Sequence, residues 1–105
     1  MSDCIFCKIS NKEIPTEILY EDDVCVIFPD RSPSAKTHLL IVSKKHIPTI
    51  ADMEEGDELI VGHMVKQAKE MAKEKGLTGY KLQFNVGKGG GQEIFHIHLH
   101  LLSDM

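Results

Sequence analysis

The sequence lacks a long hydrophobic run, an excess of basic residues and a set of cysteines large enough for a disulfide framework. None of its apolar runs approaches the roughly 18 residues of a membrane span, and Met1–Cys4 does not start a secretory signal, so we expect a cytoplasmic protein without a membrane partner. Its net charge of −4 argues against a nucleic acid as ligand, because nucleic-acid binding depends on clustered Lys and Arg. Its three cysteines exclude a disulfide scaffold in that compartment.

Length and hydrophobic pattern predict one domain, residues 1–105, that combines strands with one long helix. Apolar residues recur at helical spacing between about 55 and 75, where Asp52 is a candidate cap and Gly76 a terminator. We expect a short helical turn over residues 4–10 and strands near 17–20, 24–28, 38–43, 80–86 and 95–102. The last two strands would form an antiparallel hairpin.

Three histidines alternate with apolar residues in the segment His96–Leu102. Alternation is the period of a β-strand, so the histidines share one face and the apolar residues share the other. Two neighbouring imidazoles cannot both be charged cheaply, so at least one should be neutral near pH 7 and able to act as nucleophile, base or metal ligand. His96 and His100 would lie about 13 Å apart, so at most two of the three can bind one ion. A strand that carries histidines by chance is the alternative.

The loop before this strand, residues 85–92, holds four of the chain's eight glycines. Glycine allows positive φ and close backbone approach, so successive N–H groups of such a loop can hold an anion. It is not a Walker A loop, because Gly89 follows Lys88, and it is not a dinucleotide fingerprint, because no helix follows. Alone it would indicate a hairpin turn. Beside a histidine strand it favours a phosphate cradle next to a nucleophile.

The remaining polar residues have ordinary interpretations on pattern alone. The Cys4-x-x-Cys7 spacing suits a zinc ion or a redox pair but provides no second ligand pair. Cys25 lies in an apolar strand pattern and should be buried. His63, on the expected helix, is interpreted as a surface or packing residue. Asp30 lies between two prolines and is typical of a turn.

The segment His96–Leu102 resembles the signature of the histidine triad (HIT) family of nucleotide-binding proteins. Other segments agree with that family in order and spacing over nearly the whole chain: Ile5–Ile9, Tyr20–Asp23, Phe28–Pro33, Thr37–Val42, Lys44–Ile47 and Gly90–Gln92. Among its branches, the chain most resembles the Hint-like purine nucleoside phosphoramidases. The resemblance implies an α+β fold with an antiparallel sheet of about five strands and one long helix, joined to a second sheet in a symmetric homodimer.

The resemblance also implies a reaction, the hydrolysis of purine nucleoside 5′-phosphoramidates through a nucleotidyl-histidine intermediate. His98 would be the nucleophile, His100 would contact the phosphate and protonate the leaving group, and His38 would orient or buffer the nucleophile. AMP or GMP would be contacted by Asp30 at the ribose, by Phe6, Ile9 and Phe28 at the base, and by Asn85, Gly91, Gln92, Glu93, His98 and His100 at the phosphate. The apolar walls would tolerate either purine.

Family members with this cysteine pair often complete a zinc site with two histidines. The implied ligands here are Cys4, Cys7, His46 and His96, a closed structural site. Glu93 departs from the many relatives that have Ser or Thr, so only its backbone amide could serve the phosphate, and we expect its carboxylate to point away. The alternative functions are a dinucleoside polyphosphate hydrolase of a sister branch and a non-catalytic zinc- and nucleotide-binding interaction module.

Overall fold

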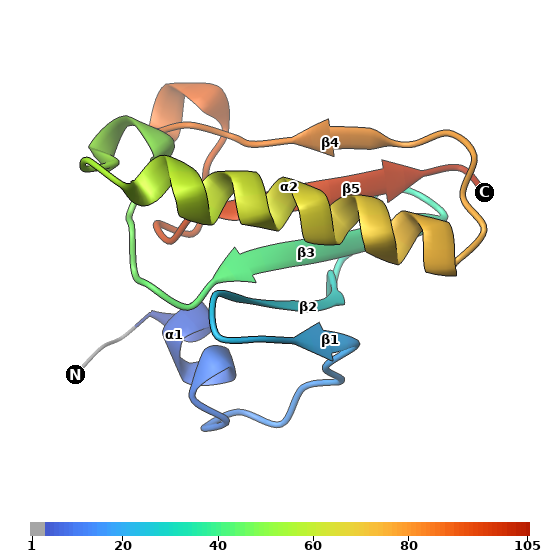
Figure 1. Cartoon of the computed structure of the whole chain (residues 1–105), viewed down its shortest axis with the longest axis horizontal. Helices are drawn as coiled ribbons and strands as arrows, with labels where there is room; N and C mark the ends of the chain where they lie inside the picture. The colour runs from blue at the N-terminus through green and yellow to red at the C-terminus, as the bar shows by residue number, and fades with distance from the viewer. Residues whose placement is uncertain (1–3) are drawn as a thin grey trace.

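A computed structural model describes residues 4–105; the start of the chain, Met1–Asp3, where a secretory signal would begin, lies outside the described residues. One antiparallel sheet runs through the molecule in the strand order β1-β2-β3-β5-β4 (Figure 1). Its strands are β1 Tyr20–Glu21, β2 Cys25–Pro29, β3 Thr37–Ser43, β4 Lys81–Gln83 and β5 His98–Ser103. The other elements are α1 Ile5–Ser10, α2 Asp57–Glu74 and two short 3₁₀ turns, η1 Ile50–Asp52 and η2 Lys88–Gly90. The predicted antiparallel sheet with one long helix is confirmed.

Several element boundaries differ from the predicted ones. Strand β5 begins at His98 rather than at residue 95, because the Ile97 N–H bonds to the Ile47 carbonyl, outside the ladder with β3. Strand β4 ends at Gln83, short of the predicted 86, where the chain turns into the glycine loop. The pairing of β1 with β2 is restricted to Tyr20 and Glu21, whereas residues 17–20 were expected. The β4–β5 pair remains antiparallel, as predicted.

Helix α2 starts at Asp57, so the prediction of Asp52 as its cap is wrong. Asp52 belongs to η1, where its carboxylate accepts a hydrogen bond from the Thr49 hydroxyl at 2.9 Å. The helix instead follows Gly56, whose φ of +93° suits glycine. Gly76 lies just beyond the helix with φ of +73°, as expected of a terminator. Neither α2 nor any other helix within the described residues has the length and apolar character needed to cross a membrane.

The sheet buries apolar residues on both faces. On the face covered by α2, the alternate residues of β5 pack against Met64 and Ala68 together with Ile27 and Ile41. On the opposite face, α1 covers a second cluster made of Phe6, Ile9, Val26, Phe28, Leu40 and Val42. Because His98 and His100 pair with Val42 and Leu40, they belong to this second face. The predicted division of the strand into an apolar face and a histidine face is confirmed.

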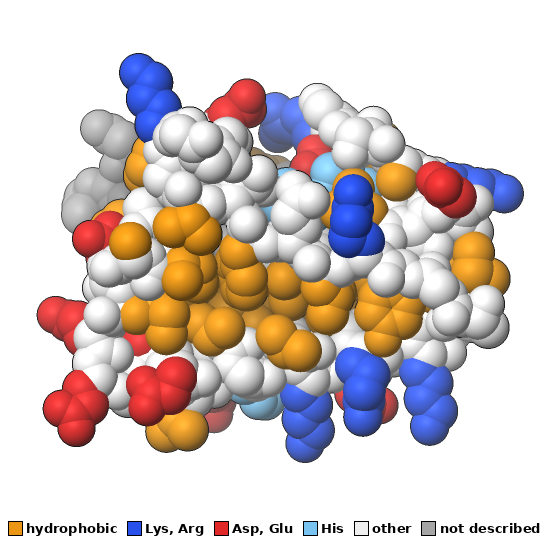
Figure 2. All heavy atoms as spheres, turned by 90° about the horizontal axis from the view of Figure 1, so that it is seen from above, with side chains coloured by type: hydrophobic (Ala, Val, Ile, Leu, Met, Phe, Trp, Pro, Cys, Tyr) orange, Lys and Arg blue, Asp and Glu red, His pale blue; other side chains and the backbone are white. Residues whose placement is uncertain are grey.

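An apolar band crosses the surface on the β4 side of the molecule (Figure 2). His63 reaches Asp22, in the turn between β1 and β2, so the opposite flank of α2, which carries Val61 and Val65, faces β4. Leu82 and Phe84 pack against the same cluster as the helix. We call Val61, Val65, Leu82 and Phe84 the apolar face. It lies along a sheet edge where β4 has a strand on one side only.

Candidate active site

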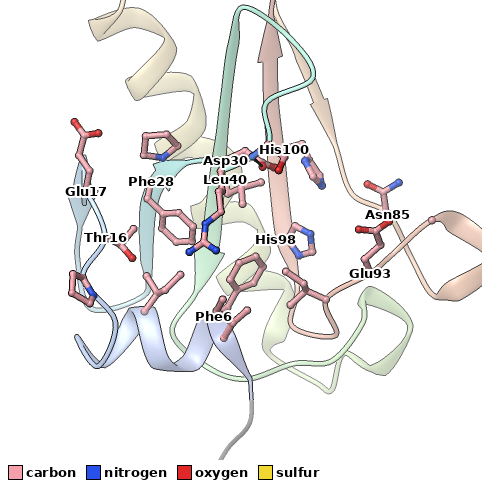
Figure 3. A pocket seen from close by; sticks show the side chains of 18 residues that line it. Phe6, Thr16, Glu17, Phe28, Asp30, Leu40, Asn85, Glu93, His98 and His100 are labelled. Atoms are coloured by element: carbon pink, nitrogen blue, oxygen red, sulfur yellow. Dashed lines mark hydrogen bonds between the residues drawn. The ribbon is translucent and has the colours of Figure 1, made fainter.

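A pocket of about 560 Å³ opens on the α1 face of the sheet, over β2, β3 and β5 (Figure 3). Most of the predicted nucleotide-binding residues line it: Phe6, Ile9, Phe28, Asp30, Asn85, Gly91, Glu93, His98 and His100. They come from α1, from β2 and the turn after it, from β5 and from the glycine loop, which the sheet order brings together.

His98 has a defined tautomer. Its Nδ1 lies 2.8 Å from the backbone carbonyl of His96, an acceptor, so Nδ1 donates and the ring's proton is on that nitrogen. The lone pair is therefore left on Nε2. His98 is 8% exposed, and its ring packs edge-on against Phe6 at a centroid distance of 4.9 Å, so the orientation of the ring is restricted. A neutral imidazole held in this way can act as a nucleophile.

The proton position on His100 is set by a chain of hydrogen bonds that starts at a backbone amide. The Ser34 N–H donates to His38 Nδ1 at 3.0 Å, so the His38 proton is on Nε2. His38 Nε2 in turn lies 2.9 Å from His100 Nδ1 and donates to it. His100 must therefore carry its own proton on Nε2. His98 and His100 thus present opposite functions at neighbouring positions, a lone pair and an N–H.

Burial keeps these rings neutral near pH 7. It lowers the pKa of His98, and it lowers the pKa of His100 to about 4 with a further contribution from the neighbouring rings of His98 and His38. Burial likewise lowers the pKa of His96 to about 4. The expectation that at least one of the three histidines is neutral is confirmed for all three.

Asp30 is both a turn residue and a pocket residue. Its Oδ1 accepts a hydrogen bond from the Ser32 N–H at 2.7 Å, the turn arrangement expected from its sequence neighbours. Its Oδ2 lies 3.3 Å from His38 Nε2. The carboxylate also borders the pocket, so its Oδ2 can accept hydrogen bonds from a ligand hydroxyl.

The Gln92 side chain anchors the glycine loop. The Gln92 side chain is 5% exposed, and its amide donates to the carbonyls of Pro48 and Ile94 at 2.7 and 2.9 Å. Its Oε1 accepts from the Gly87 N–H at 2.8 Å. Both N–H donors and the oxygen of this side chain are therefore bonded within the protein, and Gln92 does not line the pocket, so a nucleotide contact of Gln92 stays a prediction.

The pocket also contains residues that the sequence patterns did not single out. Arg31 and Leu40 border it near Asp30, and Thr16 and Glu17 border it at one end. Leu40 could have been found from its strand partner, since alternation places it on the histidine face. The expected outward direction of Glu93 is wrong, because its side chain lines the pocket (Figure 3). Its neighbour Gln92 occupies the buried side of the loop and leaves Glu93 the pocket side.

Four predicted metal ligands do meet at one point. Cys4, Cys7, His46 and His96 place one ligand atom each within 4.8 Å of one another. His96 Nδ1 lies 3.2–3.5 Å from the two sulfurs and from His46 Nδ1, and Cys7 Sγ lies 3.2 Å from His46 Nδ1. A tetrahedral zinc ion separates nitrogen and sulfur ligands by roughly 3.3–3.8 Å, given its bond lengths. His96 Nε2 donates to the Ser43 carbonyl at 2.6 Å, so its Nδ1 lone pair faces the other three atoms. The donor set therefore fits a zinc ion.

Two other groups of similar compactness do not fit an ion as well. In the group Asp30, His38 and His100, the Ser34 amide keeps the His38 proton on Nε2, so this nitrogen has no lone pair to give. In the group Asp22, Cys25 and His63, Asp22 Oδ2 accepts from His63 Nε2 at 2.6 Å, and burial raises the pKa of the fully buried Cys25 to about 12. His63 is thus a packing residue, and Cys25 is buried, as predicted.

Comparison with known proteins places the chain in a family. The family model described as "Scavenger mRNA decapping enzyme C-term binding" matches residues 3–105. Protein HitA of Neisseria gonorrhoeae is 46% identical over 103 residues, 97% of this chain and 96% of the relative. The purine nucleoside phosphoramidase of Escherichia coli K12 is 44% identical over 100 residues, 93% of this chain and 84% of the relative.

Solved structures agree with these matches. A HIT family hydrolase from Legionella pneumophila superposes with a TM-score of 0.94 at 48% identity, over 98% of this chain and 94% of that one. A zinc-bound histidine triad family protein from Mycobacterium smegmatis superposes with a TM-score of 0.86 at 30% identity, over 98% and 76% of the two chains. The fold and the histidine strand are those of an α+β protein of the HIT type, and the chain belongs to the histidine triad family.

The low pKa of His100 predicts a pH-dependent loss of stability. Between its ordinary pKa of 6.5 and the folded value of about 4, the unfolded chain binds a proton that the folded chain does not. The free energy of unfolding therefore falls as the pH drops through this window. Between about pH 7 and pH 4.5 we expect the wild type to lose about 1–2 kcal/mol more than His100→Gln, with partial exposure allowed for. Urea unfolding measures both, and parallel pH profiles would contradict the assignment.

Proposed function

We propose that the protein is a nucleotide hydrolase that cleaves purine nucleoside 5′-phosphoramidates, an adenosine 5′-monophosphoramidase type of activity. The observation that supports this most directly is the hydrogen bond from His98 Nδ1 to the His96 carbonyl, which leaves a nucleophilic Nε2 on a pocket residue. The neighbouring His100 offers an N–H for the departing amine. The Escherichia coli relative named a purine nucleoside phosphoramidase supports the same reaction.

In the proposed reaction, His98 Nε2 attacks phosphorus in line with the bond to the leaving nitrogen. A bond forms between Nε2 and phosphorus as the phosphorus–nitrogen bond breaks, and the nitrogen leaves with the electron pair and takes the His100 Nε2 proton. Water then attacks the nucleotidyl-histidine and returns a proton to His100. The products are the amine and the nucleoside monophosphate, and His98 regains its neutral tautomer.

We assign the nucleoside part of the substrate to the region of the pocket lined by the predicted base and ribose contacts. Phe6, Ile9 and Phe28 provide apolar walls for a purine, and Asp30 Oδ2 is an acceptor for the ribose hydroxyls. This arrangement assigns no hydrogen-bonding group to the base, so it does not distinguish adenine from guanine. Backbone amides of the glycine loop, including that of Glu93, are assigned to the phosphate, with Asn85 and Gly91 beside them.

The first test is the covalent intermediate. Rapid quenching of the wild type with adenosine 5′-phosphoramidate should reveal a mass increase of one nucleotidyl group on His98. His98→Ala should lose turnover by about three orders of magnitude or more and still bind AMP, because the ribose and base contacts lie on other residues. Steady-state kinetics and calorimetric titration measure these effects.

His63→Gln is the matched control, since His63 lies outside the pocket, and it should keep turnover and show the adduct. Wild-type turnover by His98→Ala would overturn the mechanism. Turnover of diadenosine polyphosphates in preference to phosphoramidates would favour the sister hydrolase activity, and AMP binding with no turnover of either substrate would favour the interaction module.

We also propose that Cys4, Cys7, His46 and His96 hold a structural zinc ion. The convergence of their four ligand atoms supports this, as does the zinc-bound relative from Mycobacterium smegmatis. A zinc ion in a closed four-ligand site contributes folding stability rather than reaction chemistry. It would tie α1 to the segment that enters β5, because Cys4 and Cys7 flank the start of α1 and His96 precedes His98.

Metal analysis tests this proposal. Protein purified without chelators should contain about one zinc ion per chain, and Cys4→Ser combined with Cys7→Ser should lose the ion and melt at a lower temperature. Cys25→Ala is the control, because Cys25 lies in β2 outside the cluster and its variant should keep the ion. Wild-type protein with no zinc would remove the proposal.

We propose a homodimer formed through the apolar face. An exposed edge strand beside an apolar surface favours pairing with another chain, and a second copy presents the same elements across a two-fold axis. Val65, the residue of the apolar face chosen for the test, is 40% exposed on α2. We also propose that residues 1–105 form a single domain. We propose a cytoplasmic location, where nucleotide substrates are available.

The mass in solution tests the dimer. Light scattering coupled to size exclusion should give about twice the chain mass of 11.8 kDa, and Val65→Glu should shift the mass toward one chain because it buries a charge in the interface. Leu59→Glu is the matched control, since Leu59 is 76% exposed on another side of α2. A wild type of one-chain mass, or equal masses for both variants, would contradict the interface.

A further inference from the structure

The pocket has two chemically different ends. Phe28, Thr16 and Glu17 lie at one end and Asn85 and Glu93 at the other, with His98 between them (Figure 3). A nucleoside phosphoramidate is linear, with base, ribose, phosphorus and leaving amine in that order. If the base occupies the end near Phe28 and phosphorus lies at His98, the leaving amine extends toward Glu93.

Glu93 is held at this position by the loop that precedes it. Gln92 is anchored by three hydrogen bonds, and Gly91 has φ of +86°, so the backbone before Glu93 has a fixed path. Within residues 4–105 no hydrogen bond or ion pair involves the Glu93 carboxylate. Its negative charge is therefore available to whatever enters this end of the pocket.

The charges around the pocket make this carboxylate effective on the leaving group. The pocket is lined by three acidic residues, Glu17, Asp30 and Glu93, and by one basic residue, Arg31, which follows Asp30 at the nucleoside part. Apart from Arg31, no Lys or Arg lines the pocket among the described residues. A carboxylate without a counter-charge repels an anionic leaving group and attracts a cationic one.

A second hollow adjoins the pocket at Glu93. It measures about 330 Å³ and is lined, among the described residues, by Cys4, Ile5, Glu93, Ile94 and Phe95. Ile5, Glu93 and Ile94 also line the nucleotide pocket, so the two spaces adjoin at these residues. Phe95 is 44% exposed and offers an apolar surface. Apolar walls around one carboxylate suit an alkyl chain that ends in an ammonium group.

We infer that Glu93 determines the leaving-group specificity of this protein, and that its substrate class is nucleoside 5′-phosphoramidates whose departing amine bears a second, positively charged amine on an apolar chain. The inference rests on the proposed phosphoramidase function. It also gives a reason against polyphosphate leaving groups, which would bring further negative charge next to Glu93. Glu93 acts here on binding and orientation of the leaving group, whereas the proton still comes from His100.

Three adenosine 5′-phosphoramidates of matched length test the inference, with 1,5-diaminopentane, hexylamine and 6-aminohexanoate as leaving amines. For the wild type we expect kcat/KM to decrease in the order cationic, neutral, anionic, with the cationic substrate about two- to fivefold above the neutral one, as for an exposed ion pair. In Glu93→Gln this ratio should fall to about one, and Glu93→Lys should reverse the order. Roughly 0.5 M salt should reduce the wild-type ratio.

Glu17→Gln is the matched control, because it removes the same charge from the opposite end of the pocket, and it should keep the wild-type ratio. Equal kcat/KM for the three substrates in the wild type, or the same order in Glu93→Gln as in the wild type, would overturn the specificity while leaving the phosphoramidase function intact. Absence of turnover with all three substrates would overturn the proposed function and this inference with it.

Discussion

The hydrogen bond from the His98 ring to the His96 carbonyl is the interaction on which the rest of the site depends. It places the proton on Nδ1 and the lone pair on Nε2, and without it a neutral imidazole would distribute between two tautomers. The same residue, His96, donates through its own ring to the Ser43 carbonyl and turns its Nδ1 toward two cysteines and His46. One short segment of backbone therefore connects the proposed nucleophile with the proposed zinc site.

Burial determines the charge of the histidine rings, and hydrogen bonding determines their tautomers. Burial keeps the rings neutral, as the low pKa of His100 indicates, but burial does not choose a tautomer. That choice comes from backbone groups, the His96 carbonyl for His98 and the Ser34 amide, through His38, for His100. The outcome is a base and an acid on adjacent positions of one strand face. The same proton on His38 makes the nearby Asp30, His38 and His100 group a hydrogen-bonded relay rather than a metal site.

The features that could be predicted from the sequence were those that leave a pattern in neighbouring residues. Alternation in His96–Leu102 predicted a strand with a histidine face, and glycine content marked the loop. Local pattern did not identify the start of α2 correctly. The Asp52 carboxylate accepts a hydrogen bond from the Thr49 hydroxyl, and α2 begins four residues later than a cap at Asp52 would require. The direction of Glu93 depends on the anchoring of Gln92 to Pro48, more than forty positions away in sequence. The partners of the two cysteines came from family resemblance, since spacing alone does not bring His46 and His96 together.

The central claim is that His98 is neutral with its proton on Nδ1. Long-range ¹H–¹⁵N correlation NMR of uniformly ¹⁵N-labelled protein at about pH 7 measures this directly, because protonated and unprotonated imidazole nitrogens differ in chemical shift, and a His98→Gln sample assigns the signals. The account predicts a protonated Nδ1 and an unprotonated Nε2 for His98. A proton on Nε2, or on both nitrogens, would contradict it.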